Sequence, residues 1–198
     1  MMRPLSLSEL RLPLEGQLHG ADCDILGVST DSRTLHDGDL FVALRGEHFD
    51  GQEYVAQANS VGATAALVRQ VVASSMPQLQ VADTQRALGL LGAYNRQQYK
   101  GPLIGITGSS GKTTVKNMVH SVLSRRGETL ATEGNFNNEI GVPLTLLRLR
   151  PGVESAGVEM RASKPGYIDC LCEFACPTIA FFLNAMPALP AAVCGVYW

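Results

Sequence analysis

The stretch that decides the fold of this chain is Gly105-Ile106-Thr107-Gly108-Ser109-Ser110-Gly111-Lys112-Thr113-Thr114. A short apolar segment, residues 101–104, precedes it and predicts the end of a buried strand. After it, apolar residues recur at helical spacing and predict a helix: Val115, Met118, Val119, Val122 and Leu123. A strand, a glycine-rich turn and a helix form the setting that a phosphate-binding loop requires.

The residue types of this loop suit the binding of a nucleotide's phosphates. Glycine lets the backbone curl so that successive N–H groups face an anion, and the helix N-terminus adds partial positive charge. Lys112 can reach the β- and γ-phosphates, and the Thr113 hydroxyl can bind Mg²⁺. The strict Walker pattern needs glycine where this chain has Ile106, so a turn that only joins strand to helix is the alternative. The predicted nucleotide-binding residues are Gly108, Ser109, Ser110, Gly111, Lys112, Thr113 and Thr114.

Composition indicates a globular α/β protein of one large or two small domains. The chain has 198 residues, of which 45% are hydrophobic and 17% charged, and a net charge of −2. No basic field or Lys/Arg run points to nucleic acid or to a membrane surface. The N-terminus lacks the apolar core of a signal peptide, and the apolar C-terminal stretch is too short and proline-interrupted for a membrane span. We therefore expect a cytoplasmic protein.

Cysteine usage favours free thiols over a metal site. The chain has five cysteines, and four of them lie in the last 30 residues. Their spacing includes C-x-C-x3-C, which differs from the C-x2-C pairs of common structural zinc sites. Free thiols in a reducing compartment are the expectation, and zinc binding is the alternative.

The N-terminal part, residues 1–82, alternates short strands and helices. Two polar loops, 30–33 and 46–51, flank the predicted buried strand 40–44. They form either a ligand-binding rim at strand ends or ordinary turns, and the pattern alone does not separate the two. A long helix begins at Asp83-Thr84, which places the predicted boundary between domains 1–82 and 83–198 there.

The second part predicts a mainly parallel sheet with helices on both faces, because strands and helices alternate. The loop 133–143 holds three asparagines, whose amides both donate and accept; an asparagine-rich turn is the alternative. Glu159 ends a predicted strand, where an Mg²⁺ ligand belongs, or else is a solvated carboxylate. Residues 178–184 predict a further buried strand. The tail 188–198 is apolar, without period or caps, and fits neither element type.

Two long motifs resemble the Mur ligase family. They are residues 105–116 and 132–147. Three shorter segments of the N-terminal part also resemble this family: 30–33, 38–44 and 49–51. The resemblance covers about residues 25–187. Within the family, the chain most resembles the branch that adds D-alanyl-D-alanine to UDP-N-acetylmuramoyl-tripeptide. It implies a small N-terminal α/β domain that binds the UDP-sugar, followed by an ATP-binding P-loop domain.

The resemblance also implies a reaction and residue roles. ATP would phosphorylate the tripeptide's terminal carboxylate, and the amine of D-Ala-D-Ala would attack the acyl phosphate. Lys112 would be the catalytic residue at the γ-phosphate, Thr113 and Glu159 would hold Mg²⁺, and Thr30 and Ser32 would contact the UDP-sugar. Three asparagines would line the substrate cleft: Asn135, Asn137 and Asn138. We expect a monomer.

The chain also departs from the family pattern. Arg161 stands where the family has glycine, and a cation there would compete with Mg²⁺ for Glu159. Leu189 stands at the position of a metal-binding histidine, and the remainder of the central domain and the C-terminal domain have no counterpart. These departures predict a frameshifted or truncated copy with negligible ligase activity. A non-catalytic module that binds UDP-muramoyl peptide is one alternative, and an unrelated P-loop NTPase is another.

Overall fold

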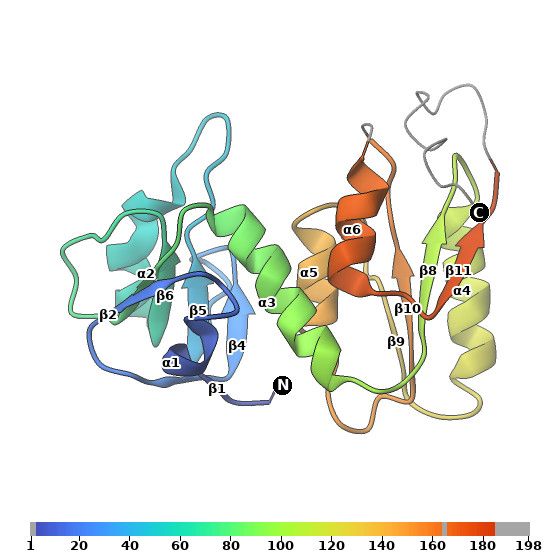
Figure 1. Cartoon of the computed structure of the whole chain (residues 1–198), viewed down its shortest axis with the longest axis horizontal. Coiled ribbons are helices and arrows are strands. Elements are labelled where there is room, and N and C mark those ends of the chain that lie inside the picture. Colours follow the sequence, from blue (N-terminus) through green and yellow to red (C-terminus); the bar gives the residue numbers. More distant parts are fainter. Residues whose placement is uncertain (1–2, 164–165, 185–198) are drawn as a thin grey trace. The chain divides into compact units, whose positions relative to one another are not determined.

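The computed structural model describes residues 3–163 and 166–184 (Figure 1). The chain divides into two compact units, Met1–Leu91 and Gly92–Trp198. The division falls inside the long helix α3, Thr84–Gln98, whose first residue is next to the predicted boundary at 83. Asp83 caps this helix as expected, because its Oδ1 accepts from the N–H groups of Gln85 and Arg86 at 2.8 and 3.0 Å.

Unit 1 is a mixed α/β structure. Its main sheet has the order β2-β7-β6-β5-β4, in which β2 pairs antiparallel and the other strands pair parallel. A second sheet pairs β1 with β3 antiparallel. The elements are β1 (Leu5–Ser6), α1 (Leu7–Leu10), β2 (Gln17–His19), β3 (Asp24–Ile25), β4 (Gly27–Ser29), β5 (Asp39–Val42), a 3-10 helix (Gly51–Tyr54), α2 (Val55–Val61), β6 (Ala65–Val68) and β7 (Gln78–Gln80).

Local signals explain the boundaries in unit 1. Ser6 caps α1, with its Oγ accepting from the Glu9 N–H at 3.1 Å. Gly62 ends α2 at a φ of 114°, a conformation that favours glycine. Residues 24–29 form two strands, β3 and β4, and not one, because Leu26 donates its N–H to the Gly38 carbonyl and each half joins a different sheet. Strand β5 is fully buried, as predicted.

Unit 2 confirms the predicted parallel sheet. Its described strands have the order β11-β8-β10-β9, all parallel, and Figure 1 shows α4 on one face and α5 and α6 on the other. The chain order β8-α4-β9-α5-β10-α6-β11 is that of an open α/β sheet. The elements are β8 (Leu103–Thr107), α4 (Lys112–Leu123), β9 (Thr129–Ala131), α5 (Gly141–Leu146), β10 (Ser155–Glu159), α6 (Tyr167–Ala175) and β11 (Ile179–Phe182).

Two predictions for unit 2 are wrong in detail. Strand β8 does not end at 104 but continues to Thr107, because residues 104–106 pair with β10 on one side and β11 on the other. Strand β11 was predicted to be buried, yet all four of its residues are exposed, because β11 is the edge strand of the described sheet. The predicted tail, 188–198, lies outside the described residues.

The second half of α3 anchors the helices of unit 2. Asn95 is buried and its Nδ2 donates to the carbonyls of Leu146, the last residue of α5, and of Leu149, which follows it, each at 2.9 Å. Arg96 donates from Nε to the Ala175 carbonyl at 2.9 Å, at the end of α6. These bonds satisfy carbonyls that a helix end leaves unpaired. Within the described residues, no helix has both the length and the apolar character to cross a membrane.

Candidate functional site

The predicted phosphate loop has the backbone shape that its glycines allow. Strand β8 ends at Thr107 and α4 begins at Lys112, so the loop is four residues long. Gly108 and Gly111 have φ values of 145° and 79°, which residues with a Cβ rarely adopt. A Cβ at Gly108 would also lie 3.1 Å from the Cβ of Leu183. Glycine at 108 is therefore required by conformation and by space.

The loop's N–H groups fall into two sets. The Ser109 and Ser110 N–H groups donate to the Oδ1 of Asn184 at 3.0 and 3.1 Å, and Asn184 Nδ2 donates to the Ser110 Oγ at 3.1 Å. The N–H groups of the first turn of α4, residues 112–114, have no carbonyl partner within the helix, as at any helix start. An anion placed there would meet these N–H groups and the positive end of the helix dipole.

Lysine 112 already lies at the loop. Its Nζ donates to the carbonyl of Gly108 at 2.8 Å, so the side chain folds back over the loop. One residue before the loop, the Thr107 hydroxyl is buried and has no hydrogen-bond partner among the described residues. A polar ligand group beside it would remove the cost of that unpaired hydroxyl.

Glu159 joins the loop to the neighbouring strand. The parallel register pairs Glu159 with Ile106, which brings the carboxyl end of β10 beside that of β8. Its Oε2 accepts from the Thr113 hydroxyl at 3.0 Å and its Oε1 from the Asn137 amide at 2.9 Å. Only 3% of Glu159 is exposed. The structure thus brings together three residues that the sequence analysis singled out, from α4, β10 and the asparagine-rich loop.

The three asparagines have different surroundings. Asn137 contacts Glu159, whereas Asn138 acts as a helix cap, because its Oδ1 accepts from the Ile140 and Gly141 N–H groups at 3.3 and 2.8 Å. The side chain of Asn135 is exposed. Asn137 is therefore the one of the three that lies against the predicted metal site.

Arg161 does not pair with Glu159 in the part of the chain that the structure describes. Its backbone N–H donates to the carbonyl of Asn137 at 2.8 Å, and its side chain is exposed. The expected competition for the Glu159 carboxylate is absent from the described contacts. The predicted replacement of a metal-binding histidine, Leu189, lies outside the described residues.

A pocket of about 510 Å³ in unit 1 contains both predicted UDP-sugar residues, Thr30 and Ser32. It opens at the carboxyl ends of β4 and β5, where ligands bind in parallel sheets. Ser32 is buried, and its hydroxyl donates to the Gln57 Oε1 at 3.4 Å. The pocket also has exposed aromatic rings. Its lining is Thr30, Asp31, Ser32, Arg33, Phe41, Phe49, Gly51, Tyr54 and Gln57.

An ion pair stands at the mouth of this pocket. Arg33 Nη2 and Asp31 Oδ2 are 2.6 Å apart, and the Arg33 backbone N–H also donates to Asp31 at 2.9 Å. The hydrogen bonds from the guanidinium lower the pKa of Asp31 from 3.8 to about 2. The carboxylate therefore stays ionised at every physiological pH.

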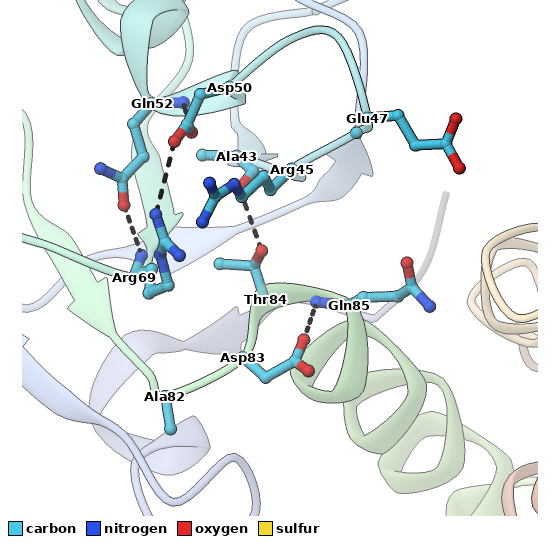
Figure 2. A pocket seen from close by; sticks show the side chains of 11 residues that line it. Ala43, Arg45, Glu47, Asp50, Gln52, Arg69, Ala82, Asp83, Thr84 and Gln85 are labelled. Carbon is cyan, nitrogen blue, oxygen red and sulfur yellow. Dashed lines mark hydrogen bonds and ion pairs between the residues drawn. The ribbon is translucent and has the colours of Figure 1, made fainter.

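A second pocket of unit 1, of about 480 Å³, opens at the ends of β5, β6 and β7. Figure 2 shows that its polar groups bond mainly to one another. Asp50 accepts from Arg69 at 3.4 Å, Gln52 accepts from the Arg69 N–H at 3.0 Å, and Thr84 donates to the Ala43 carbonyl at 3.0 Å. The loop 46–51 therefore borders both pockets.

No metal-binding cluster is found among the described residues. Within residues 3–163 and 166–184, no group of three or more His, Cys, Asp or Glu side chains is placed to hold a metal ion. Cys172 and Cys176 are free thiols, and burial raises the pKa of the Cys172 thiol. Cys194 lies outside the described residues.

Two contributors to the site were not predicted. Asn184 follows β11, and the signal that singled out Glu159, a polar residue at the carboxyl end of a strand next to the loop, applies to it equally. Lys116 is buried in α4 and donates to the Thr132 carbonyl at 2.7 Å, while the Thr132 Oγ1 accepts from the Glu159 N–H at 2.9 Å. A lysine in an amphipathic helix is normally expected on the exposed face. No sequence signal therefore indicated that Lys116 is buried and supports Glu159 through Thr132.

This chain is similar in sequence to known proteins. The sequence patterns "Mur ligase family, catalytic domain" and "Mur ligase middle domain" match residues 24–95 and 106–188. The UDP-N-acetylmuramoyl-tripeptide–D-alanyl-D-alanine ligase of Escherichia coli is 45% identical over 187 residues, which cover 94% of this chain and 41% of that protein.

Solved structures agree with this similarity. A crystal structure of MurF from Acinetobacter baumannii has a TM-score of 0.88 and 41% identity, covering 92% of this chain and 41% of that one. MurF ligase from Thermotoga maritima in complex with ADP has a TM-score of 0.73 and 36% identity, covering 79% and 37%. The chain therefore spans about two fifths of the length of the relatives it matches.

Proposed function

The chain belongs to the Mur ligase family, and we propose that it provides the UDP-sugar-binding and ATP-binding parts of a UDP-N-acetylmuramoyl-tripeptide–D-alanyl-D-alanine ligase. The observation that carries this proposal is the cluster of Thr113, Asn137 and Glu159 beside a phosphate loop at the carboxyl edge of a parallel sheet. The relatives named above carry the same activity in their names. In this proposal residues 1–82 bind the UDP-muramoyl peptide and residues 83–198 bind ATP.

The phosphates of ATP would bind across the loop and the first turn of α4. Lys112 would leave the Gly108 carbonyl and hold the γ-phosphate, where its charge offsets the charge that develops during transfer. The phosphates would meet the N–H groups of the first turn of α4, which belong to the predicted nucleotide-binding residues Lys112, Thr113 and Thr114. The fold similarity to a ligase that binds ADP supports a nucleotide in this loop.

The donor set beside the loop fits Mg²⁺. A carboxylate and a hydroxyl are hard oxygen ligands of the kind that Mg²⁺ prefers. Glu159 and Thr113 would hold the ion, because their oxygens already lie 3.0 Å apart. When bound, Mg²⁺ would supply charge neutralisation at the phosphates. Asn137 would orient the Glu159 carboxylate through its 2.9 Å hydrogen bond.

The UDP-sugar would occupy the pocket that Thr30 and Ser32 line. Exposed aromatic rings at Phe49 and Tyr54 give the uracil base a surface to stack on. Hydroxyl groups of the two predicted residues suit hydrogen bonds to the sugar or the pyrophosphate. Asn135, Asn137 and Asn138 would line the part of the cleft near the phosphates, with Asn138 acting chiefly by capping α5.

The reaction needs positioning and charge neutralisation more than proton transfer. The tripeptide carboxylate attacks the γ-phosphorus of ATP, ADP leaves, and the acyl phosphate is consumed when the amine of D-Ala-D-Ala displaces phosphate to form the amide. The residues of this chain would contribute by binding and positioning the tripeptide carboxylate and the γ-phosphate of ATP. We place the reaction in the cytoplasm, where ATP is available, and propose that the chain acts as one copy.

Turnover is proposed to need parts outside this sequence, because the relatives are more than twice as long as the matched region. The 198-residue polypeptide alone is expected to bind both ligands and to form no ADP above background in the presence of UDP-N-acetylmuramoyl-tripeptide and D-Ala-D-Ala. ADP formation that depends on both substrates would contradict this expectation.

Isothermal titration of the chain with each ligand separately tests the proposal. Binding of both UDP-N-acetylmuramoyl-tripeptide and Mg–ATP is expected. Binding of the UDP compound without ATP would favour a non-catalytic binding module instead, since the pocket of unit 1 is complete within that unit. Binding of ATP without the UDP compound would favour an unrelated P-loop NTPase.

A further inference from the structure

Lys116 is a charged residue inside the packing between α4 and the sheet of unit 2. Only 6% of it is exposed, and α4 packs on β8, β9 and β10. Its Nζ donates to the Thr132 carbonyl at 2.7 Å. In the part of the chain that the structure describes, this is the single hydrogen bond of the ammonium group, and no carboxylate forms an ion pair with it. The fold thus contains a buried cation to which the proposed function assigns no role.

Thr132, which accepts this bond, is also tied to β10. It is 2% exposed, and its N–H donates to the Gly157 carbonyl at 3.0 Å. The paired residues of β9 and β10 end at Ala131 and Gly157, so no carbonyl of β9 faces the Glu159 N–H. The Thr132 hydroxyl accepts from that N–H instead, at 2.9 Å. The backbone of Glu159 is therefore fixed by Thr132, and Thr132 is fixed by Lys116.

The hydrogen bonds return to α4 through the Glu159 side chain, because the Thr113 hydroxyl donates to Oε2 at 3.0 Å. Thr113 and Lys116 are three residues apart and lie on the same side of the helix. We refer to the closed loop of Thr113, Lys116, Thr132 and Glu159 as the α4–Glu159 ring. Thr113 is exposed and the other three residues are buried. A ligand from solvent would meet the ring at Thr113, and the buried bonds would hold it in position.

Filling space does not explain a lysine at position 116. Removal of an ammonium group from water costs free energy that one neutral carbonyl does not offset. Methionine has a similar length and no charge, so it would fill the same space without that cost. It would, however, lack the donor that ties Thr132 to the helix. The tie to Thr132 is thus what the lysine adds.

We propose that Lys116 is a positioning residue for the proposed Mg²⁺ site, and that it sets the 3.0 Å spacing of the Thr113 and Glu159 oxygens through Thr132. It contacts neither the nucleotide nor the ion, and it acts by fixing the Glu159 backbone relative to the first turn of α4. This inference rests on the proposed binding of Mg–ATP, and does not depend on the ligase reaction or on the UDP compound.

The spacing of the two oxygens matters most for a small ion. Mg²⁺ requires near-ideal octahedral geometry with oxygens at about 2.0–2.1 Å, whereas Ca²⁺ accepts flexible geometry at about 2.3–2.6 Å. Loss of Lys116 should therefore weaken the binding of ATP with Mg²⁺, weaken it less with Ca²⁺, and leave the binding of metal-free ATP nearly unchanged. A general loss of packing would weaken all three equally.

Lys116→Met in the full chain tests this by calorimetry with ATP plus Mg²⁺, ATP plus Ca²⁺, and ATP with a chelator. Changes in groups that orient metal ligands typically alter metal affinity roughly 10–100-fold, so the dissociation constant should rise about tenfold with Mg²⁺. It should rise by no more than about threefold with Ca²⁺ and about twofold without metal. Equal changes in the three conditions would overturn the proposal.

Lys100→Met is the matched control for this measurement. The Lys100 Nζ also donates to a backbone carbonyl, that of Gln97 at 3.0 Å, but Lys100 is exposed and lies outside the ring. None of the three dissociation constants should change in this variant. The same loss of Mg–ATP binding in Lys100→Met as in Lys116→Met would overturn the proposal.

A double-mutant cycle tests the route through Thr132. Thr132→Val keeps the shape and the carbonyl that Lys116 contacts, but removes the hydroxyl that accepts from Glu159. Residues that act through one network have non-additive effects. In the Thr132→Val background, Lys116→Met should therefore change Mg–ATP binding by less than about twofold. A full effect of Lys116→Met in that background would contradict this route and overturn the proposal.

Amide hydrogen exchange of the wild-type chain keeps the test decisive if a variant does not fold. The Glu159 amide should exchange at least about threefold more slowly with ATP plus Mg²⁺ than with ATP alone, because the ion and the ring then hold Glu159 together. Equal exchange in both conditions would overturn the proposal. A wild-type chain that binds no ATP would contradict the proposed function as well, whereas normal wild-type binding with no metal dependence in Lys116→Met would overturn this inference alone.

Discussion

At the scale of single residues, the Glu159 carboxylate determines what can bind beside the phosphate loop. It is almost fully buried, and its oxygens bond to neutral groups, the Thr113 hydroxyl and the Asn137 amide. A buried carboxylate whose contacts are neutral favours a cation nearby. The proposed Mg²⁺ would supply that charge.

A substitution of Glu159 tests whether its negative charge, and not its size, is needed for Mg²⁺ binding. Glu159→Gln keeps the size of the side chain, so the fold should persist, but it removes the charge that attracts Mg²⁺. ATP binding with Mg²⁺ should weaken at least tenfold, which corresponds to about 1.4 kcal/mol, while binding without Mg²⁺ should change less than twofold. Calorimetry with and without Mg²⁺ measures both, and Glu173→Gln, exposed on α6, is the control. Equal weakening in both conditions would refute the metal role.

The Asp31–Arg33 pair makes a prediction about pH. Because the pKa of Asp31 is about 2 in the folded chain and 3.8 ordinarily, the folded state favours the ionised carboxylate. The contribution of the pair to stability is therefore present above about pH 4 and is lost as the pH falls toward 2. Carboxyl-carbon NMR should show Asp31 titrating near pH 2. Arg33→Gln should raise that pKa toward 3.8, and an unshifted midpoint would contradict the assigned cause.

At the scale of elements, Asn184 links β11 to the phosphate loop. Its carboxamide engages the Ser109 and Ser110 N–H groups and leaves those of the first turn of α4 for phosphate. This division of donors indicates that Asn184 holds the loop in shape and does not itself contact the nucleotide. Asn184 is a positioning residue in this view.

Asn184→Ala tests that view. The variant should weaken Mg–ATP binding at least tenfold, because the loop loses the three hydrogen bonds of the Asn184 carboxamide, worth roughly 0.5–1.5 kcal/mol each. Binding of the UDP compound, measured by the same titration, should not change. Asn59→Ala, at an exposed asparagine outside both proposed sites, serves as the control. Tighter ATP binding in Asn184→Ala would mean that Asn184 competes with phosphate for the loop.

Most elements could be predicted because their signals are local. Helix α3 follows from its cap at Asp83, and the order of unit 2 follows from alternating strand and helix periods. The end of β8 could not be predicted, since Gly105 is a poor strand residue that pairing with two neighbouring strands holds extended. The exposure of β11 was also not predicted, because a short apolar sequence does not indicate whether the strand lies at the edge or in the middle of a sheet.

At the scale of the whole molecule, each unit presents its candidate site at the carboxyl edge of its own parallel strands. In unit 1 the pocket that contains Thr30 and Ser32 opens at the ends of β4 and β5, and in unit 2 the loop follows β8. The loop residues were singled out by their motif, and Thr30 and Ser32 by the family resemblance, and the binding roles of both sets stay predictions. Support from Lys116 and Asn184 arises only when distant segments pack, so it was not predictable.

We propose that one chain carries two separate ligand sites, one in each unit. Amide NMR of the labelled full chain tests it most directly, with a non-hydrolysable ATP analogue plus Mg²⁺ and, separately, UDP-N-acetylmuramoyl-tripeptide. The ATP analogue should shift the amides of residues 111–114 and leave 30–33 unchanged, and the UDP compound should do the reverse. Shifts of the same amides by both ligands, or of neither set, would contradict the claim.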